Sequence, residues 1–302
     1  MAERGARFFA YGWVLLVLAA CAPETPVTDP AATQREAEGE VKGGPAHLQH
    51  VTQITQTQLE TAHNQSADWL SYGRDYREDR YSPLTQINKQ TVSELGLAWS
   101  LDLGTKRGIQ ATPIVVDGIM FVTGPWSVVW AINTRDGQIL WKFDPEVPRD
   151  VAGRLCCGVV NRGVAIYQGD VFVGTLDGRL ISLNAATGKP NWSVQTVPIG
   201  EFYSITGAPR IVKGRVLIGN GGAEFKARGY VTAYDAKSGE QDWRFYTVPG
   251  NPKDEFEHPD LAQAVQTWNG EWWRQGGGGT VWDAINYDPE LNLVYILSLI
   301  HI

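Results

Sequence analysis

The sequence predicts an all-β fold built from repeated units, and three observations support this prediction. The chain of 302 residues contains 33 glycines and 12 tryptophans. Glycine at this level is typical of many short strands joined by turns, and tryptophan needs a large buried site with a partner for its N–H. The third observation is a motif that ends on a tryptophan at positions 141, 192 and 243, which are 51 residues apart both times.

Each copy of the motif has the pattern of a β-hairpin. An alternating apolar segment leads to Asn or Asp and then to Gly, residue types that allow the positive φ of a tight turn. A repeat of about fifty residues with several strands is typical of a propeller blade, and the tryptophan is expected to fill the gap between neighbouring blades. Residues 68–296 have the length of four to five such blades. The copies are Ala131-Ile-Asn-Thr-Arg-Asp-Gly137-Gln-Ile-Leu-Trp141, Ser182-Leu-Asn-Ala-Ala-Thr-Gly188-Lys-Pro-Asn-Trp192 and Ala233-Tyr-Asp-Ala-Lys-Ser-Gly239-Glu-Gln-Asp-Trp243.

Composition and spacing exclude several classes of function. A hydrophobic fraction of 43% excludes wholesale disorder, and a net charge of −7 argues against a protein that binds nucleic acid. The five histidines are scattered without the spacing of a zinc site. Residues 276–279 are four glycines, but no Gly-Lys-Ser/Thr follows them as in a phosphate-binding loop. A serine hydrolase is disfavoured because the sequence has no Gly-x-Ser-x-Gly motif.

The N-terminus has the pattern of an export signal. Arg4 and Arg7 precede a short apolar run over residues 8–20, and Leu18-Ala-Ala-Cys21 follows. This ending resembles the bacterial lipobox, which implies a signal peptide at 1–21 and lipidation of Cys21. Ala22 resembles the outer-membrane sorting residue, so we expect a periplasmic protein that is lipid-anchored to the outer membrane of a Gram-negative bacterium. The alternative is an ordinary secretory signal with a chance cysteine.

The remaining segments follow from composition. Residues 22–50 carry Pro, Thr, Glu and Gly without periodicity, which predicts a flexible tether. Residues 51–64 have weak helical spacing and are expected to cap the domain at 51–296. The last six residues, 297–302, are interpreted as a non-native tail.

The repeats resemble the tryptophan-docking motifs of the PQQ-dependent (quinoprotein) alcohol dehydrogenases, and the quinohaemoprotein type is the nearest within that family. The resemblance also includes Leu95-Gly-Leu-Ala-Trp99, Asn161-Arg-Gly163 and Gly270-Glu-Trp-Trp273. It implies an eight-bladed propeller with pyrroloquinoline quinone (PQQ) on its axis. It also implies that this chain is an N-terminal fragment with the first four to five blades.

The adjacent cysteines at 156 and 157 are the most specific feature of the resemblance. Neighbouring cysteines bridge only through a strained eight-membered ring, so such a pair is poorly suited to closing a loop. The resemblance implies a disulfide between Cys156 and Cys157 that lies against one face of PQQ; two free buried thiols are the alternative. Arg162 matches an arginine that pairs with the PQQ carboxylates, a role that suits a bidentate guanidinium.

Two further segments match cofactor contacts of the family. Thr206, in Ser204-Ile-Thr-Gly-Ala-Pro209, corresponds to a threonine that hydrogen-bonds PQQ. Gly221, Gly222 and Ala223 are small residues that let backbone amides approach the quinone. Glu224 corresponds to a calcium ligand, and its carboxylate is a hard oxygen donor for a hard ion.

One more segment matches cofactor contacts of the family, and one position departs from the family pattern. Thr280 corresponds to a PQQ contact, and Trp282 to the tryptophan that stacks on the second face of the cofactor. Gln110 stands before Ala-Thr-Pro, where the family usually has Glu. Glutamine keeps hydrogen bonding but loses the charge, so cofactor electronics or substrate handling is expected to differ.

The resemblance implies oxidation of a small alcohol to an aldehyde. Ca²⁺ polarises a PQQ carbonyl, a carboxylate takes the hydroxyl proton, hydride passes to the quinone, and a cytochrome accepts the electrons. The base aspartate and a haem c site have no counterpart in this sequence, so the chain alone is predicted to be inactive. The alternative is a non-catalytic lipoprotein propeller scaffold of the outer-membrane assembly type, which shares the repeat and the anchor but does not need the cofactor motifs.

Overall fold

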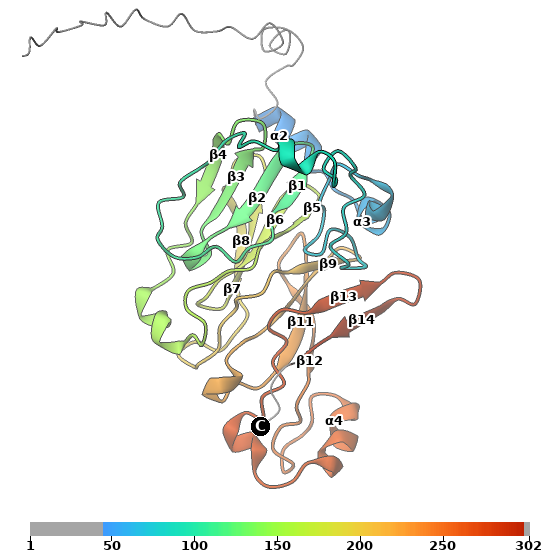
Figure 1. The fold of residues 1–302 in the computed structure, drawn as a ribbon. Coiled ribbons are helices and arrows are strands. Elements are labelled where there is room, and N and C mark those ends of the chain that lie inside the picture. Colours follow the sequence, from blue (N-terminus) through green and yellow to red (C-terminus); the bar gives the residue numbers. More distant parts are fainter. Residues whose placement is uncertain (1–44, 299–302) are drawn as a thin grey trace, which may run out of the picture. The chain divides into compact units, whose positions relative to one another are not determined.

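Three four-stranded antiparallel sheets follow one another along the chain (Figure 1). They belong to a computed structural model that describes residues 45–298. The predicted signal peptide, Cys21 and most of the predicted tether lie outside the described residues. In each sheet the strands pair in the order in which they occur along the chain, as in a propeller blade.

The strand bounds reproduce the predicted repeat. The first sheet is β1 (Ile114–Val116), β2 (Ile119–Thr123), β3 (Val129–Asn133) and β4 (Ile139–Phe143). The second is β5 (Ala165–Tyr167), β6 (Asp170–Gly174), β7 (Arg179–Asn184) and β8 (Pro190–Gln195). The third is β9 (Arg210–Val212), β10 (Arg215–Gly219), β11 (Tyr230–Asp235) and β12 (Gln241–Tyr246). A two-stranded sheet of β13 (Ile285–Asp288) and β14 (Leu293–Ile296) follows.

The repeated tryptophan connects each sheet to the next. Trp141 ends the first sheet and donates from Nε1 to the carbonyl of Ala185, in the hairpin turn of the second sheet, at 2.8 Å. Its ring lies against Gly188 so closely that a Cβ at this position would be 2.7 Å from the ring. Trp192 makes the same bond to Ala236 at 3.2 Å. The prediction that the tryptophan fills the gap between blades is therefore confirmed for Trp141 and Trp192, whereas Trp243 is 39% exposed.

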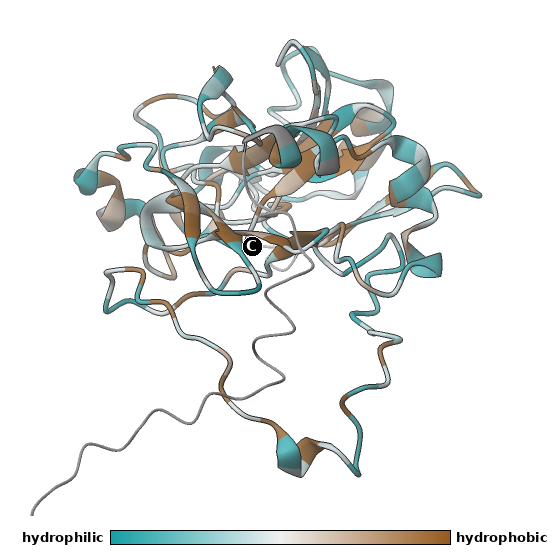
Figure 2. Ribbon diagram, turned by 90° about the horizontal axis from the view of Figure 1, so that it is seen from above, coloured by the Kyte–Doolittle hydropathy of each residue, from teal (hydrophilic) through white to brown (hydrophobic). Residues whose placement is uncertain are grey.

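A continuous apolar core joins the sheets. The inner strands are almost wholly buried, and Phe121, Phe172 and Val216 from successive sheets belong to one cluster. Figure 2 shows that hydrophobic residues concentrate on these strands, while the connecting loops are mostly hydrophilic. The first strands β5, β9 and β13 of successive sheets are neighbours, so the segments that precede them are brought together.

The described residues hold fewer blades than the repeat arithmetic predicts. They form three complete four-stranded sheets and one two-stranded sheet, not four to five blades. Two long segments without strands account for the difference, at residues 77–113 and 247–284. The estimate divided the length of residues 68–296 by a blade length of about fifty residues, and so counted these strand-free segments as parts of blades. The eight-bladed form stays a prediction.

The N-terminal part of the described chain is helical. Helix α2 (Pro45–Val51) overlaps the predicted tether, and Leu48 within it is only 1% exposed, so the described end of that segment is packed against the domain rather than free. Helix α3 (Gln56–Glu60) begins with a capping box. Thr55 accepts from the backbone N–H of Gln58, and the Gln58 side chain accepts from the backbone of Thr55.

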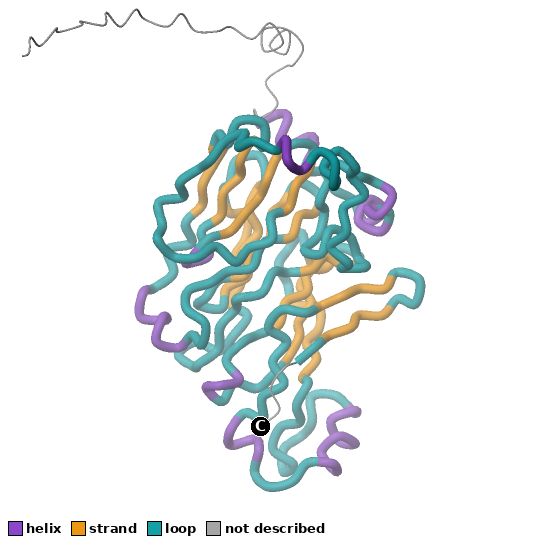
Figure 3. The backbone as a smooth tube through the Cα atoms, viewed as in Figure 1, coloured by secondary structure: helices purple, strands orange, loops and turns teal. Residues whose placement is uncertain are grey.

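The remaining helices are short and lie outside the sheets (Figure 3). Within residues 45–298, none of the helices has the length and apolar character needed to cross a membrane. The remaining α-helix is α4 (Pro259–Ala264). The 3-10 helices are η1 (Ala62–Asn64), η2 (Val92–Glu94), η3 (Pro125–Ser127), η4 (Arg149–Arg154), η5 (Ala223–Phe225), η6 (Val265–Thr267) and η7 (Trp272–Gln275). Residues 299–302 of the predicted tail lie outside the described residues.

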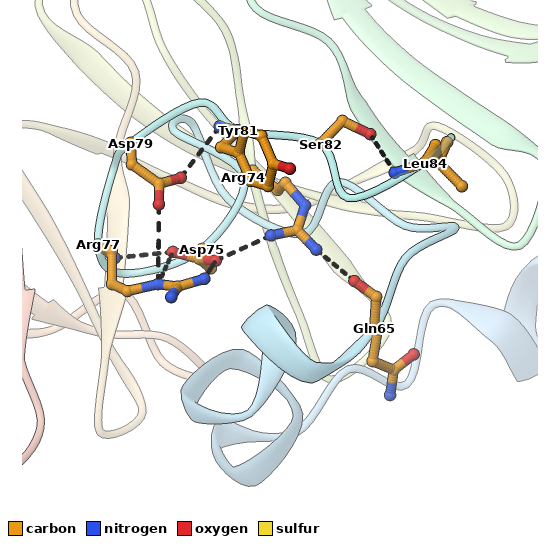
Figure 4. A network of polar contacts seen from close by, with 8 residues as sticks. All are labelled: Gln65, Arg74, Asp75, Arg77, Asp79, Tyr81, Ser82 and Leu84. Carbon is orange, nitrogen blue, oxygen red and sulfur yellow. Dashed lines mark hydrogen bonds and ion pairs between the residues drawn. The ribbon is translucent and has the colours of Figure 1, made fainter. Parts of the chain in front are cut away.

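A buried ionic network fixes the loop that follows Trp69 (Figure 4). Arg74 and Asp75 are each 2% exposed and form an ion pair with Nη1 and Oδ2 at 3.0 Å. Arg77 donates to the same carboxylate from its side chain and from its backbone N–H. Burial alone would raise the pKa of Asp75, but these hydrogen bonds and charges hold it below its ordinary value of 3.8.

We expect Trp141→Ala to destabilise the 302-residue chain by about 3 kcal/mol, because it removes a buried ring and leaves the Ala185 carbonyl without its donor. Trp243→Ala is the matched control, since Trp243 occupies the same repeat position but is 39% exposed. Its cost is expected to stay below about 1 kcal/mol. Denaturant unfolding of both variants measures this difference, and equal losses would contradict the docking role.

We expect Asp75→Asn to destabilise the fold by about 3 kcal/mol at neutral pH, because the variant leaves the buried Arg74 charge uncompensated. The pKa of Asp75 is lowered in the folded chain. Its contribution to stability is thus complete above pH 3.8 and is lost as pH falls through the folded pKa. The gap in unfolding free energy between wild type and variant should therefore shrink in acid. A gap that is independent of pH would refute this assignment.

Candidate functional site

A pocket of about 210 Å³ lies beside the inner segments of the second and third sheets and the segment before β13. Nine of the eleven predicted cofactor-binding residues line it. These nine are Cys156, Cys157, Arg162, Thr206, Gly221, Gly222, Glu224, Thr280 and Trp282. Arg154, Leu155 and Ser204 complete the lining.

The repeat explains why residues so far apart in sequence meet. Arg162 stands just before β5, Thr206 just before β9 and Trp282 just before β13. Since the first strands of successive sheets are neighbours, these segments run side by side. The backbone N–H of Arg162 donates to the carbonyl of Thr206 at 3.0 Å, and the N–H of Thr112 donates to the carbonyl of Arg162 at 3.0 Å.

Arg162 and Trp282 form one wall of the pocket. The Arg162 guanidinium carbon lies 4.6 Å from the centre of the Trp282 ring, a cation–π distance. Nη1 of Arg162 also donates to the carbonyl of Thr206 at 3.3 Å. The contact with the indole and this single hydrogen bond orient the guanidinium and leave most of its five N–H donors for a ligand.

A glycine turn brings Glu224 to the pocket. Gly222 has φ of 107°, and a Cβ there would lie 2.2 Å from the carbonyl oxygen of Phe202, so only glycine fits. The turn continues into η5, which carries Glu224 with its side chain exposed. Ser204 and Gly221 pair as an isolated β-bridge beside this turn. The bridge pairs the N–H and the carbonyl of Gly221 with the backbone of Ser204, so these two groups are used within the protein.

The adjacent cysteines lie next to this carboxylate. Both are exposed residues with free thiols in the structure, so the disulfide stays a prediction. Partial burial of the sulfur, the hydrogen bond to Cys157 and the charge of Glu224 raise the pKa of the Cys156 thiol to about 12. While reduced, Cys156 is thus neutral at physiological pH.

Two predicted cofactor-binding residues do not line the pocket. Gln110 is exposed and lies in an irregular segment before β1, so the structure does not bring it to the other site residues. Its neighbour Thr112 reaches the backbone of Arg162 instead. Ala223 is 2% exposed and is buried behind the glycine turn.

Sequence reasoning missed three residues of the lining. Ser204 stands two residues before Thr206 in an extended segment, so alternation could have placed it on the same face. Leu155 directly precedes the cysteine pair. Arg154 has no local pattern that marks it; it ends η4 and pairs with the exposed Asp150 at 3.3 Å.

The donor set fits an anionic, flat cofactor better than a metal ion alone. Two guanidiniums, three hydroxyl-bearing side chains and an indole ring match a planar ligand with carboxylates. Within residues 45–298, no cluster of three His, Cys, Asp or Glu side chains could hold a metal ion. For calcium the pocket offers one carboxylate, Glu224.

This fold and this site define the chain as part of a propeller domain with a pocket whose lining suits an anionic, flat cofactor. The family model described as "Glucose/ethanol/alcohol dehydrogenase, beta-propeller domain" matches residues 69–298. The chain therefore belongs to the family of PQQ-dependent alcohol dehydrogenases. The family assignment does not favour the lipoprotein scaffold that the sequence left open.

Curated relatives and solved structures are similar to the chain. Quinohemoprotein alcohol dehydrogenase ADH-IIG of Pseudomonas putida is 57% identical over 237 residues, which are 78% of this chain and 33% of the relative. The 1-butanol dehydrogenase (cytochrome c) of Thauera butanivorans is 52% identical over 67% of this chain and 29% of the relative. The crystal structure of the quinohemoprotein alcohol dehydrogenase from Comamonas testosteroni matches with 49% identity and a TM-score of 0.81, covering 84% of this chain and 38% of that chain. The chain thus spans about a third of the length of these relatives.

We expect Arg162→Gln, made in the full-length protein, to weaken PQQ binding about tenfold or more, because a charged hydrogen bond contributes about 1.5–3 kcal/mol. Arg149→Gln is the control, since Arg149 is exposed and lies over Trp126 outside the pocket. Titration of the apoprotein with PQQ measures both dissociation constants. A loss of affinity in both variants alike would indicate a general effect of charge and would contradict the assignment.

Proposed function

We propose that this chain supplies the PQQ-binding part of a dehydrogenase that oxidises alcohols to aldehydes. The observation that carries the proposal is the convergence of Arg162, Trp282, Glu224 and the cysteine pair on one pocket. Because the chain spans about a third of its relatives, the activity belongs to the longer protein. The 302 residues alone are expected not to turn over alcohol.

The residues of the chain would act on the cofactor in distinct ways. Arg162 binds a carboxylate of PQQ, and the Trp282 ring provides a flat wall for stacking. The hydroxyls of Thr206 and Thr280 offer hydrogen bonds at the cofactor edge. Bound PQQ supplies the hydride acceptor, which no side chain of the chain provides.

Glu224 is proposed as one oxygen ligand of a calcium ion that acts as a Lewis acid at the cofactor. The adjacent cysteines are proposed to form a disulfide that covers the face of PQQ opposite Trp282. In an exported protein thiols tend to oxidise, which supports this pairing over free thiols.

The surroundings of the enzyme are proposed from the N-terminal sequence and from the relatives. The basic and apolar start with Cys21 supports a periplasmic protein with a lipid anchor in the outer membrane. One relative is named for its link to cytochrome c, which supports a cytochrome as electron acceptor. A haem c group would require a part of the protein outside this chain.

The test uses the full-length protein with PQQ, Ca²⁺, a redox dye and a series of primary alcohols. We expect dye reduction that requires both PQQ and an alcohol. Glu224→Gln is expected to raise the Ca²⁺ concentration for half-maximal activity on the order of tenfold, because a ligand charge is lost. A full-length protein that neither binds PQQ nor reduces the dye would overturn the proposal.

A further inference from the structure

The loop of residues 71–80, here called the Tyr72 loop, lies behind the wall of the pocket and is firmly held. Its backbone is fixed by the buried Arg74–Asp75 pair and by Glu78, which accepts from Nε of Arg210 at 2.8 Å. Arg210 is 5% exposed and also donates to the carbonyl of Ala208 at 2.8 Å. The loop is therefore a rigid support.

Tyr72 is immobilised within this loop by two guanidiniums. Arg80 lies 4.5 Å and Arg210 lies 4.2 Å from the centre of its ring. Cation–π contacts of this kind favour one orientation of the ring. The hydroxyl at the far end of the ring consequently has a defined position.

The Tyr72 hydroxyl contacts Asp283, the residue that follows Trp282 in the sequence. Tyr72 Oη donates to Oδ2 of Asp283 at 3.5 Å, across 211 positions of sequence. The other carboxylate oxygen of Asp283 is buried and has no hydrogen-bond partner among the described residues. Asp283 as a whole is half-buried, and a carboxylate with one buried, unsatisfied oxygen depends on its remaining contact. Tyr72 is thus the side chain that fixes Asp283.

Trp282 needs such an anchor because it lies outside the sheet. Strand β13 begins only at Ile285, so no strand pairing holds Trp282 and Asp283. On one side Gly207 approaches the Trp282 backbone, where a Cβ would lie 2.2 Å from its carbonyl oxygen. On the other, Arg162 contacts the ring at 4.6 Å. A shift at Asp283 would pass directly to the neighbouring indole.

We infer that Tyr72 is a positioning residue that acts through Asp283 to fix the plane of the Trp282 ring, and with it the width of the cofactor pocket. Tyr72 itself does not line the pocket. The inference rests on the proposed function for the identity of the ligand, PQQ. Stacking requires parallel planes at contact distance, so a small rotation of the indole costs affinity.

The experiment measures PQQ affinity in the full-length apoprotein for Tyr72→Phe, Asp283→Asn and the double variant. We expect Tyr72→Phe to raise the Kd about tenfold and to shift the absorbance of bound PQQ, with the Tm of the apoprotein unchanged. Asp283→Asn should act in the same way. Because both substitutions remove the same contact, the Kd of the double variant for PQQ should be no higher than the larger of the two single-variant Kd values.

Tyr81→Phe is the matched control, since Tyr81 lies next to the same loop but is 66% exposed. Multiplicative effects of the two single variants, or a lower Tm with unchanged Kd and absorbance, would overturn the positioning role. Binding that is unaffected by Tyr72→Phe would overturn this inference alone. No PQQ binding by the wild-type protein would overturn the proposed function, and this inference with it.

Discussion

The pocket depends on the close approach of the segments that precede the first strands of successive sheets. Two backbone hydrogen bonds of 3.0 Å run from Thr112 to Arg162 and from Arg162 to Thr206. Since the peptide groups of Arg162 are used on both sides, this residue has little freedom to move. These two hydrogen bonds therefore determine the positions of the pocket residues that these segments carry.

The spacing of that ladder is set at the opposite edge of each sheet, by the tryptophans. Trp141 and Trp192 each contact the hairpin turn of the following sheet through a hydrogen bond and a glycine that leaves room for the ring. A change at these contacts would alter the angle between blades. The same repeat that buries the core therefore also determines where the cofactor pocket forms.

The sequence allowed much of this to be predicted, and the failures have physical reasons. The hairpin repeat and the residues around Cys156 and Thr206 are local patterns, and local patterns survive in the fold. Gln110 does not line the pocket because it lies in an irregular segment with no strand to hold it, and its role at the cofactor stays a prediction. The contact between Tyr72 and Asp283 joins residues 211 positions apart, and no periodicity reports such a contact.

The charge of the pocket differs from the net charge of the whole chain. The chain carries a net charge of −7, yet the charged residues of the pocket are two arginines and one glutamate. While reduced, Cys156 adds no charge, since the pKa of its thiol is raised to about 12. Arg154 is paired with Asp150 at 3.3 Å, which leaves the Arg162 guanidinium as the positive charge of the pocket available to an anionic ligand. A small ligand with several carboxylates can pair with Arg162 inside the pocket. A long polyanion would extend beyond the pocket and be repelled by the net negative charge of the chain.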